Sequence, residues 1–121
     1  MDLYVIRHGE TNENKTGIMQ GNMETLLNES GKKQAISLRE KVKEAKIDLV
    51  ICSPKLRTKE TALLAAPNIP IIYDDRLVSR NHGEFEGLER NKINLKDYWN
   101  IKKNIQYEKA ESVGDRLRQI C

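Results

Sequence analysis

Two arginines and one histidine are spaced so that they can meet at the ends of two neighbouring strands. Arg7 and His8 directly follow an apolar run, and Arg57 closely follows a second one. In an open parallel sheet, ligands bind beyond the carboxyl ends of the strands. Two guanidinium groups and a helix N-terminus at one place suit the oxygens of a phosphate. A histidine between them keeps a neutral ring nitrogen, because the flanking positive charges lower its pKa, and that nitrogen can attack phosphorus.

Three short apolar runs predict the strands that position these residues, at residues 3–6, 49–51 and 69–72. The run at residues 3–6 is continuous, which is typical of a strand buried on both faces of a sheet. Pro70 interrupts the third run and indicates the start of a strand or a sheet edge. Because the strands alternate with helical segments, we expect an α/β fold with a parallel sheet and right-handed crossovers.

Two helices are predicted between these strands, the first of them amphipathic. Apolar residues at spacings of three and four indicate a helix at residues 31–45, with Asn28 or Ser30 as its cap. The second helix is expected to begin with Ser53 as cap and Pro54 at its first position, and to carry several leucines. It therefore starts at the carboxyl edge of the sheet, where the phosphate site is expected.

The length and composition fit a single domain spanning residues 1–121. Charged residues make up 32% of the chain and aromatic residues 5%, as in a globular protein with an aliphatic core. After a loop at residues 76–87, two further helices are predicted, at residues 91–104 and 111–120. No repeat, linker or low-complexity segment divides the sequence.

Charge, hydropathy and cysteine content indicate which binding partners and which cellular compartment to expect. The net charge is +3 with lysines interleaved among acids, so we expect a solvated surface and no nucleic-acid partner. The N-terminal apolar run is too short for a signal peptide or a membrane span. Cys52, in an apolar stretch, is expected in the core, and Cys121 is the last residue. Such cysteines suit a reducing compartment, so we expect a cytoplasmic protein without a membrane partner.

Four blocks of residues occur in an order that resembles the histidine phosphatase (phosphoglycerate mutase-like) superfamily. They are Arg7-His8-Gly9-Glu10-Thr11 with Asn14, Gln20-Gly21, Gly31 and Gln34-Ala35; Ser53-Pro54 with Arg57 and Thr61-Ala62; Arg76-Leu77 with Gly83-Glu84-Phe85-Glu86-Gly87; and Glu111-Ser112 with Asp115. The resemblance spans essentially the whole chain. It implies a phosphoglycerate mutase-like fold, a three-layer sandwich whose mostly parallel sheet carries helices on both faces.

The resemblance also implies roles for particular residues. His8 would be phosphorylated on a ring nitrogen, and Arg7 and Arg57 would hold the phosphoryl oxygens during transfer. Asn14 would be a further ligand of the phosphate, and the segment with Gln20 and Gly21 would approach the substrate (a small phosphorylated metabolite). Because the arginines supply the charge stabilisation, the resemblance implies no metal and no cofactor.

The sequence departs from the family at the residue that donates a proton to the leaving group. The family has a glutamate there, and this chain has Ser79, whose hydroxyl is too weak an acid for efficient transfer. Glu84 and Glu86 lie nearby, and either could act as the proton donor only if the loop is rebuilt. Glu86 is expected to have a structural role in the loop. His82 falls where the family often has an aromatic residue, and we expect it to be a surface or loop residue without a catalytic role.

A second departure concerns the C-terminal part. The family places a second catalytic histidine on a strand after the Glu-Ser helix, and this sequence ends at Cys121, about where that strand should start. The resemblance therefore implies a C-terminally shortened member with an incomplete sheet. A missing strand would leave an exposed apolar edge. We expect such a chain to self-associate as a homo-oligomer.

Three functions follow from these observations. The first is a phosphatase that hydrolyses a small phosphomonoester through a phosphohistidine at His8. The second is a cofactor-dependent phosphoglycerate mutase, although residues 11–20 lack the tryptophan-containing stretch of that group. The third is a non-catalytic, phosphate-binding or regulatory remnant, favoured by Ser79 and by the missing second histidine. Turnover separates the third from the others, whereas phosphate binding does not.

Overall fold

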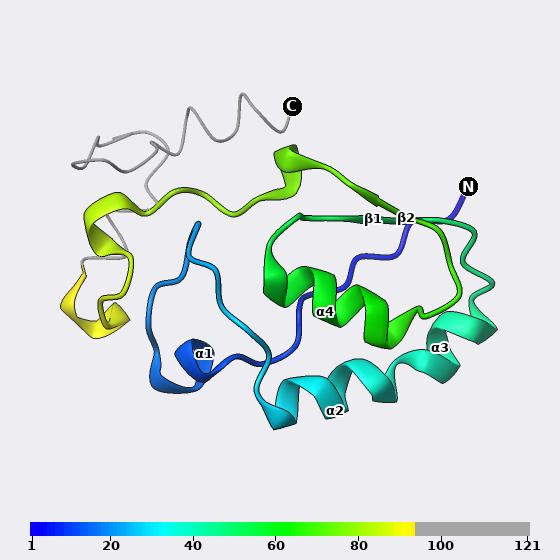
Figure 1. The fold of residues 1–121 in the computed structure, drawn as a ribbon, viewed down its shortest axis with the longest axis horizontal. Coiled ribbons are helices and arrows are strands. Elements are labelled where there is room, and N and C mark those ends of the chain that lie inside the picture. The colour runs from blue at the N-terminus through cyan, green and yellow to red at the C-terminus, as the bar shows by residue number, and fades with distance from the viewer. Residues whose placement is uncertain (94–121) are drawn as a thin grey trace.

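The computed structural model of the protein describes residues 1–93 as short helices arranged around a small sheet (Figure 1). Its elements in chain order are α1 (Asn12–Thr16), α2 (Glu29–Ser37), α3 (Arg39–Glu44), β1 (Val50–Cys52), α4 (Leu56–Ala65), β2 (Ile71–Tyr73) and the 3-10 helices η1 (Asp75–Leu77), η2 (Gly83–Phe85) and η3 (Arg90–Lys92). The helix predicted at residues 111–120 lies outside the described residues, as does all but the first part of the helix predicted at residues 91–104.

The sheet consists of β1 and β2, which pair in parallel with Val50 opposite Ile71, and α4 connects them. Pro70 lies just before β2, so its missing N–H removes no hydrogen bond between the two strands. Its carbonyl accepts from the N–H of Val50 at 3.0 Å. The strands predicted at residues 49–51 and 69–72 are confirmed to within one or two residues. Over the described residues, the predicted sandwich is represented only by this parallel strand–helix–strand unit.

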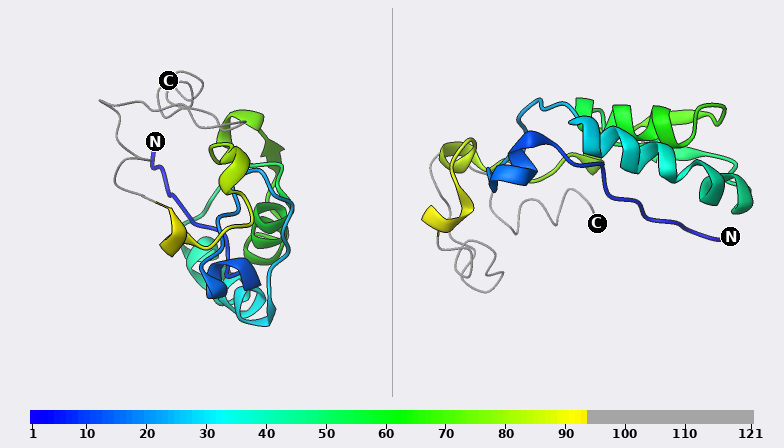
Figure 2. Two further views of the ribbon diagram at one scale, coloured as in Figure 1. Left: turned by 90° about the vertical axis from the view of Figure 1, so that its left-hand side faces the viewer. Right: turned by 90° about the horizontal axis from the view of Figure 1, so that it is seen from below.

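The helix predicted at residues 31–45 is present as two helices, α2 and α3, separated by a turn at Leu38. Asn28 is the cap of α2, because its side-chain oxygen accepts from the N–H of Gly31 at 2.8 Å. Ala35 and Val42 are buried, and they give the pair of helices one inward face. Helix α2 packs beside α4, and the two lie side by side in Figure 2.

Helix α4 begins later than predicted. Its cap is Lys55, so Ser53 and Pro54 lie in a bend before the helix and not in its first turn. The Ser53 hydroxyl accepts from the N–H of Lys55 at 3.3 Å, and the Ser53 carbonyl accepts from the Thr58 hydroxyl at 3.0 Å. These bonds satisfy the bend locally, so helical geometry is not required at Pro54.

The buried face of α4 is not formed by the leucines that this helix carries. Arg57, Thr61 and Ala65, spaced four residues apart, are buried, whereas Leu56 and Leu63 are 39% and 53% exposed. The inward stripe of the helix is therefore largely polar. It carries hydrogen-bonding groups towards the segments that follow His8 and precede α2.

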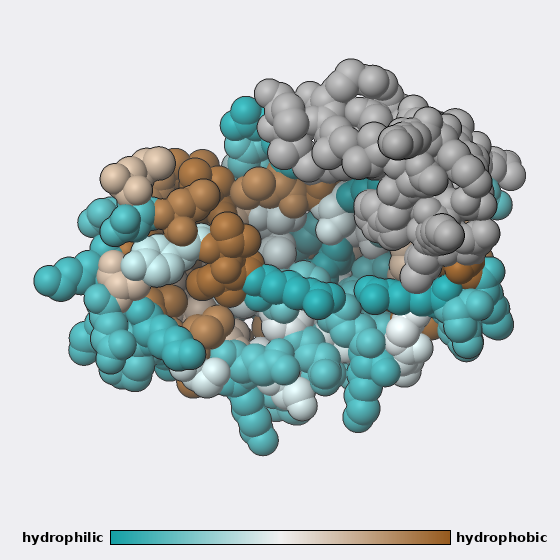
Figure 3. All heavy atoms as spheres, turned by 180° about the vertical axis from the view of Figure 1, so that it is seen from behind, coloured by the Kyte–Doolittle hydropathy of each residue, from teal (hydrophilic) through white to brown (hydrophobic). Residues whose placement is uncertain are grey.

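The prediction of a buried strand at residues 3–6 is wrong. These residues form no strand, and their side chains are 51–89% exposed. An apolar run becomes a buried strand only when a neighbouring strand and a covering layer are in place, and within residues 1–93 only β1 and β2 pair. Figure 3 shows apolar side chains gathered over the end of the molecule that carries the N-terminus.

We expect the exposed apolar segment at residues 3–6 to promote self-association at high protein concentration. Val5 is 89% exposed, so Val5→Lys should shift the sedimentation profile towards the monomer. Leu26→Lys is the matched control, because Leu26 is also exposed (58%) but lies in the loop before α2. A monomeric profile of the unaltered chain at high concentration would contradict this expectation.

The backbone that follows His8 crosses the N-terminal turn of α2 at very close range. A Cβ atom on Gly31 would lie 2.1 Å from the carbonyl oxygen of Glu10, and one on Gly9 would lie 2.5 Å from the carbonyl oxygen of Gly31. The N–H of Gly9 also donates to the Thr61 hydroxyl of α4 at 2.9 Å. The chain just after His8 is therefore fixed between α2 and α4.

Gly31→Ala should lower the free energy of unfolding by about 1–3 kcal/mol through overpacking at this crossing. The helix propensity of alanine opposes this by only about 1 kcal/mol, so the net effect is destabilising. Urea denaturation measures it, with Lys33→Ala on the exposed side of α2 as a control that should change stability by less than about 0.5 kcal/mol. An equally stable Gly31→Ala protein would mean that the two backbones can separate.

Candidate active site

A cavity of about 400 Å³ lies at the end of the molecule where α1, α4 and the 3-10 segments meet. Its lining residues are Arg7, His8, Asn14, Met19, Gln20, Gly21, Arg57, Ser79, His82 and Arg90. The structure thus brings together all the residues for which the sequence predicts catalytic or phosphate-binding roles.

His8 is half-buried, and one of its ring nitrogens is engaged by the backbone. Nδ1 lies 2.7 Å from the carbonyl oxygen of Gly9. Because a carbonyl only accepts, Nδ1 carries the proton, which leaves Nε2 with its lone pair. Burial lowers the pKa of His8, and the charges of Arg57 and Arg7 lower it further, while the bond to Gly9 partly opposes this shift. The ring is therefore a neutral imidazole at neutral pH, with its free lone pair on Nε2.

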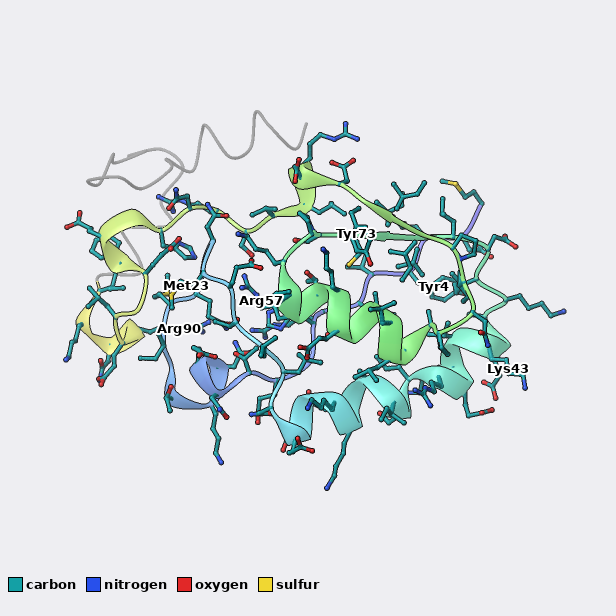
Figure 4. The ribbon with its side chains drawn as sticks, viewed as in Figure 1. Tyr4, Met23, Lys43, Arg57, Tyr73 and Arg90 are labelled. Carbon is teal, nitrogen blue, oxygen red and sulfur yellow. The ribbon has the colours of Figure 1, made fainter. Side chains whose placement is uncertain are left out.

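Arg57 lies in the first turn of α4, as predicted, but its guanidinium is buried and already bonded to protein. One terminal nitrogen donates to the carbonyl of Met23 at 2.7 Å, and the other donates to the carbonyl of Gly21 at 2.7 Å. Figure 4 shows the side chain between α4 and the segment that carries Met23. Burial lowers the pKa of Arg57, and nearby acids, Glu24 first, oppose that shift. Arg57 is thus also the support of the loop at residues 21–25.

Asn14 and Gln20 present the cavity with the amide groups predicted as phosphate ligands. The side-chain oxygen of Asn14 accepts from the N–H of Thr11 at 3.1 Å, which closes the cap of α1. The side-chain oxygen of buried Gln20 accepts from the Thr25 hydroxyl at 2.6 Å. Because both oxygens are engaged within the protein, what these amides can offer an anion is their NH₂ groups.

Ser79 lines the cavity, at the position where the family has its acid. Glu84, the candidate substitute, is exposed and is not among the described residues that line the cavity. Neither residue gives the described part of the cavity a carboxylic acid that could protonate an alkoxide. Hydrolysis of substrates with good and poor leaving groups therefore tests whether a group of the cavity donates the proton.

His82 lies in a loop, as expected, but it is buried and not at the surface. It is only 7% exposed, and it lines the cavity from the position before η2. Burial lowers the pKa of His82 to about 4, Arg80 lowers it as well, and Glu86 opposes the shift, so the ring is neutral at neutral pH. The available signal was its place at a usually aromatic position of the family, since such a position is commonly packed.

Arg90 is a third arginine of the cavity that the sequence analysis missed. It reaches the site because residues 87–90 run alongside residues 17–19: the N–H of Arg90 donates to the carbonyl of Gly17, and the N–H of Met19 donates to the carbonyl of Leu88, both at 2.9 Å. These two segments are separated by about 70 residues in the chain, and no local pattern predicts their pairing. Arg90 adds an exposed cation to the lining of a cavity that already contains Arg7 and Arg57.

Residues 1–93 contain neither a cluster of metal-binding side chains nor a membrane-spanning helix. No group of three or more histidine, cysteine, aspartate or glutamate side chains there is arranged to hold a metal ion. None of the helices in this part of the chain is both long and apolar enough to cross a membrane. Cys52, predicted to be in the core, is buried at the end of β1 with a raised thiol pKa caused first by burial.

Two known proteins that resemble this chain are phosphatases by name. A probable phosphatase of Schizosaccharomyces pombe is 41% identical over 91 residues, covering 73% of this chain and 44% of its own length. Phosphoserine phosphatase 1 of Hydrogenobacter thermophilus is 36% identical over 88 residues, covering 71% of this chain and 42% of its own. The chain thus spans less than half the length of these two relatives.

A solved structure and a family comparison agree with this result. The structure of YhfR from Bacillus stearothermophilus superimposes with a TM-score of 0.80 and 27% sequence identity, covering 93% of this chain and 60% of that one. Its likeness shows the phosphoglycerate mutase-like fold, of which residues 1–93 contribute the small parallel sheet and its helices. The family described as the histidine phosphatase superfamily, branch 1, matches residues 3–121. The chain therefore belongs to branch 1 of the histidine phosphatase superfamily.

Proposed function

We propose that this protein is a phosphatase that hydrolyses a small phosphomonoester through a phosphohistidine at His8. The observation that carries the proposal is the bond from Nδ1 of His8 to the carbonyl of Gly9, at 2.7 Å, inside a cavity that also contains Arg7 and Arg57. This bond keeps the lone pair on Nε2, and the two arginines supply the positive charge that a phosphoryl group requires. A cavity of about 400 Å³ suits a small phosphorylated metabolite.

The proposed reaction has two displacements at phosphorus. In the first, Nε2 of His8 forms the P–N bond as the bond from phosphorus to the leaving oxygen breaks, and the leaving oxygen takes up a proton from solvent water. In the second, a water oxygen attacks the phosphohistidine, its proton leaves, and phosphate is released with the neutral imidazole restored. Arg7, Arg57 and the NH₂ groups of Asn14 and Gln20 hold the phosphoryl oxygens in both displacements.

A second candidate function is phosphate binding without turnover, and Ser79 favours it. A serine in the cavity cannot protonate an alkoxide leaving group at a useful rate. The guanidinium groups of Arg7 and Arg57 and the amides of Asn14 and Gln20 would nevertheless bind a phosphate. The two candidates therefore differ in turnover alone, and hydrolysis of a substrate with a good leaving group decides between them.

His8→Ala should reduce hydrolysis of an aryl phosphate by at least about 1,000-fold, because it removes the nucleophile. Phosphate binding should persist, since the arginines and amides remain. Hydrolysis is followed by the colour of the released phenol, and mass spectrometry after rapid acid-free quenching should show one added phosphoryl group in the unaltered protein alone. Full turnover by His8→Ala would exclude the phosphohistidine mechanism, and no turnover by the unaltered chain would support phosphate binding alone.

Ser79→Glu should raise hydrolysis of an alkyl phosphate by about 10-fold or more, because it introduces a carboxylic acid at the cavity. Hydrolysis of an aryl phosphate should change much less, since its leaving group needs little protonation. Ser79→Gln is the matched control, because it has the same size without the acid, and it should give no increase. If the unaltered chain hydrolyses alkyl and aryl phosphates equally well, another acid already serves the site.

A further inference from the structure

The peptide group that joins Gly21 to Asn22 is held between two opposite charges. Its carbonyl, from Gly21, accepts from a terminal nitrogen of Arg57 at 2.7 Å. Its N–H, from Asn22, donates to a carboxylate oxygen of Glu86 at 2.9 Å. One peptide unit therefore links the guanidinium of Arg57 to the carboxylate of Glu86, and each charge polarises the group so that the other bond becomes stronger.

The same oxygen of Glu86 also holds the second loop of the cavity. It accepts from the N–H of His82 at 3.1 Å, in addition to the N–H of Asn22. A single carboxylate oxygen thus joins the loop at residues 20–23 to the loop at residues 80–87, two segments about 60 residues apart. Both loops supply lining residues of the cavity, Gly21 from the first and His82 from the second.

Gly21 is the position where this contact leaves no free space. Its φ is +50°, in the left-handed region. A Cβ atom there would lie 2.5 Å from a ring carbon of His82 and 2.6 Å from the bonded oxygen of Glu86. The two loops are therefore in direct contact at Gly21, beside the oxygen of Glu86 that bonds both of them.

Glu86 also acts on the charges of the site. Its carboxylate raises the pKa of Arg57 and of His82, against the lowering caused by the burial of both groups. Glu86 is itself only partly buried and is not among the lining residues of the cavity. It therefore acts on a bound phosphate indirectly, through the peptide group, Arg57 and the loop of His82.

We propose that Glu86 is the positioning residue of the phosphate site: it fixes the Gly21–Asn22 peptide group and thereby the guanidinium of Arg57 and the loop of His82. This inference rests on the proposed phosphate site at Arg7 and Arg57. It assigns to Glu86 a role in anion affinity that goes beyond holding its own loop together. The position of the acceptor oxygen is the decisive property, and the negative charge has a smaller effect.

Two substitutions distinguish the effect of the position of the Glu86 acceptor oxygen from the effect of its negative charge. Glu86→Gln keeps an acceptor oxygen at the same reach and loses the charge, whereas Glu86→Asp keeps the charge and withdraws the oxygen by one methylene. Glu89→Gln is the matched control, because Glu89 is exposed, close in the chain and outside the cavity lining. The probe is inorganic phosphate, titrated by calorimetry into the full chain, with KM and kcat for an aryl phosphate measured in parallel.

We expect Glu86→Asp to weaken phosphate binding about 10-fold, the loss of roughly one hydrogen bond, and to raise KM in parallel. Glu86→Gln should stay within about 3-fold of the unaltered protein, and Glu89→Gln should be unchanged. Circular dichroism verifies that each variant is folded. If Glu86→Asp does not fold, Glu86→Gln still tests the inference, because a 10-fold loss of affinity there would overturn it.

The inference is also overturned if Glu86→Asp lowers the melting temperature but binds phosphate as tightly as the unaltered chain, since Glu86 would then be structural only. Its failure is distinguishable from failure of the proposed function. Phosphate binding that depends on the reach of Glu86, without turnover, would support the inference and reject the phosphatase. An unaltered chain that binds no phosphate would reject both.

Discussion

The buried guanidinium of Arg57 is the interaction on which the described part of this protein depends. A buried charge is costly unless it is fully hydrogen-bonded, and Arg57 is only 3% exposed. Its terminal nitrogens bind the carbonyls of Gly21 and Met23, so the loop before α2 closes onto α4 in order to satisfy them. The loop in turn brings Gln20 and Gly21 to the cavity. Arg57, which was predicted to bind a ligand, therefore also binds the loop of its own chain.

His8 is held by a different constraint, which acts on the backbone and not on a charge. The chain after it passes so close to α2 that only glycine fits at Gly9 and Gly31. The N–H of Gly9 binds Thr61 on α4, and the carbonyl of Gly9 binds the ring of His8. The two helices therefore fix both the position of the imidazole and the nitrogen that carries its proton. Thr61 and Arg57 lie on one stripe of α4, so that stripe supports both halves of the site.

Some polar atoms of the residues around the cavity form hydrogen bonds within the protein, and the others are left to bind a ligand. The amide oxygens of Asn14 and Gln20 are bonded to neighbouring residues, and one oxygen of Glu86 binds two backbone N–H groups. What is left towards the cavity is mainly donors, the guanidinium groups and NH₂ groups, together with the lone pair on Nε2 of His8. A cavity of this character suits an anion. The same arrangement explains how the fold stays satisfied while the site keeps positive charge.

The sequence by itself determined the family, the parallel strand–helix–strand unit and most of the residues that line the cavity. These features rest on local signals: apolar runs, helix caps and motif blocks in a fixed order. It misjudged residues 3–6, because a buried strand depends on neighbours that the run itself does not specify. It also placed the start of α4 too early, since the side chains around Ser53 satisfy a bend as well as a helix cap.

Only the tertiary structure decided which side chains serve the site from a distance. Arg90 and His82 reach the cavity because residues 17–23 pair and pack with residues 80–90, a contact between segments that no periodicity connects. The double role of Arg57 and the reach of Glu86 to the Gly21–Asn22 peptide are likewise properties of that contact. Local sequence determines the type of each element, whereas the partners of a buried polar group are set by which loops meet, and that depends on the whole chain.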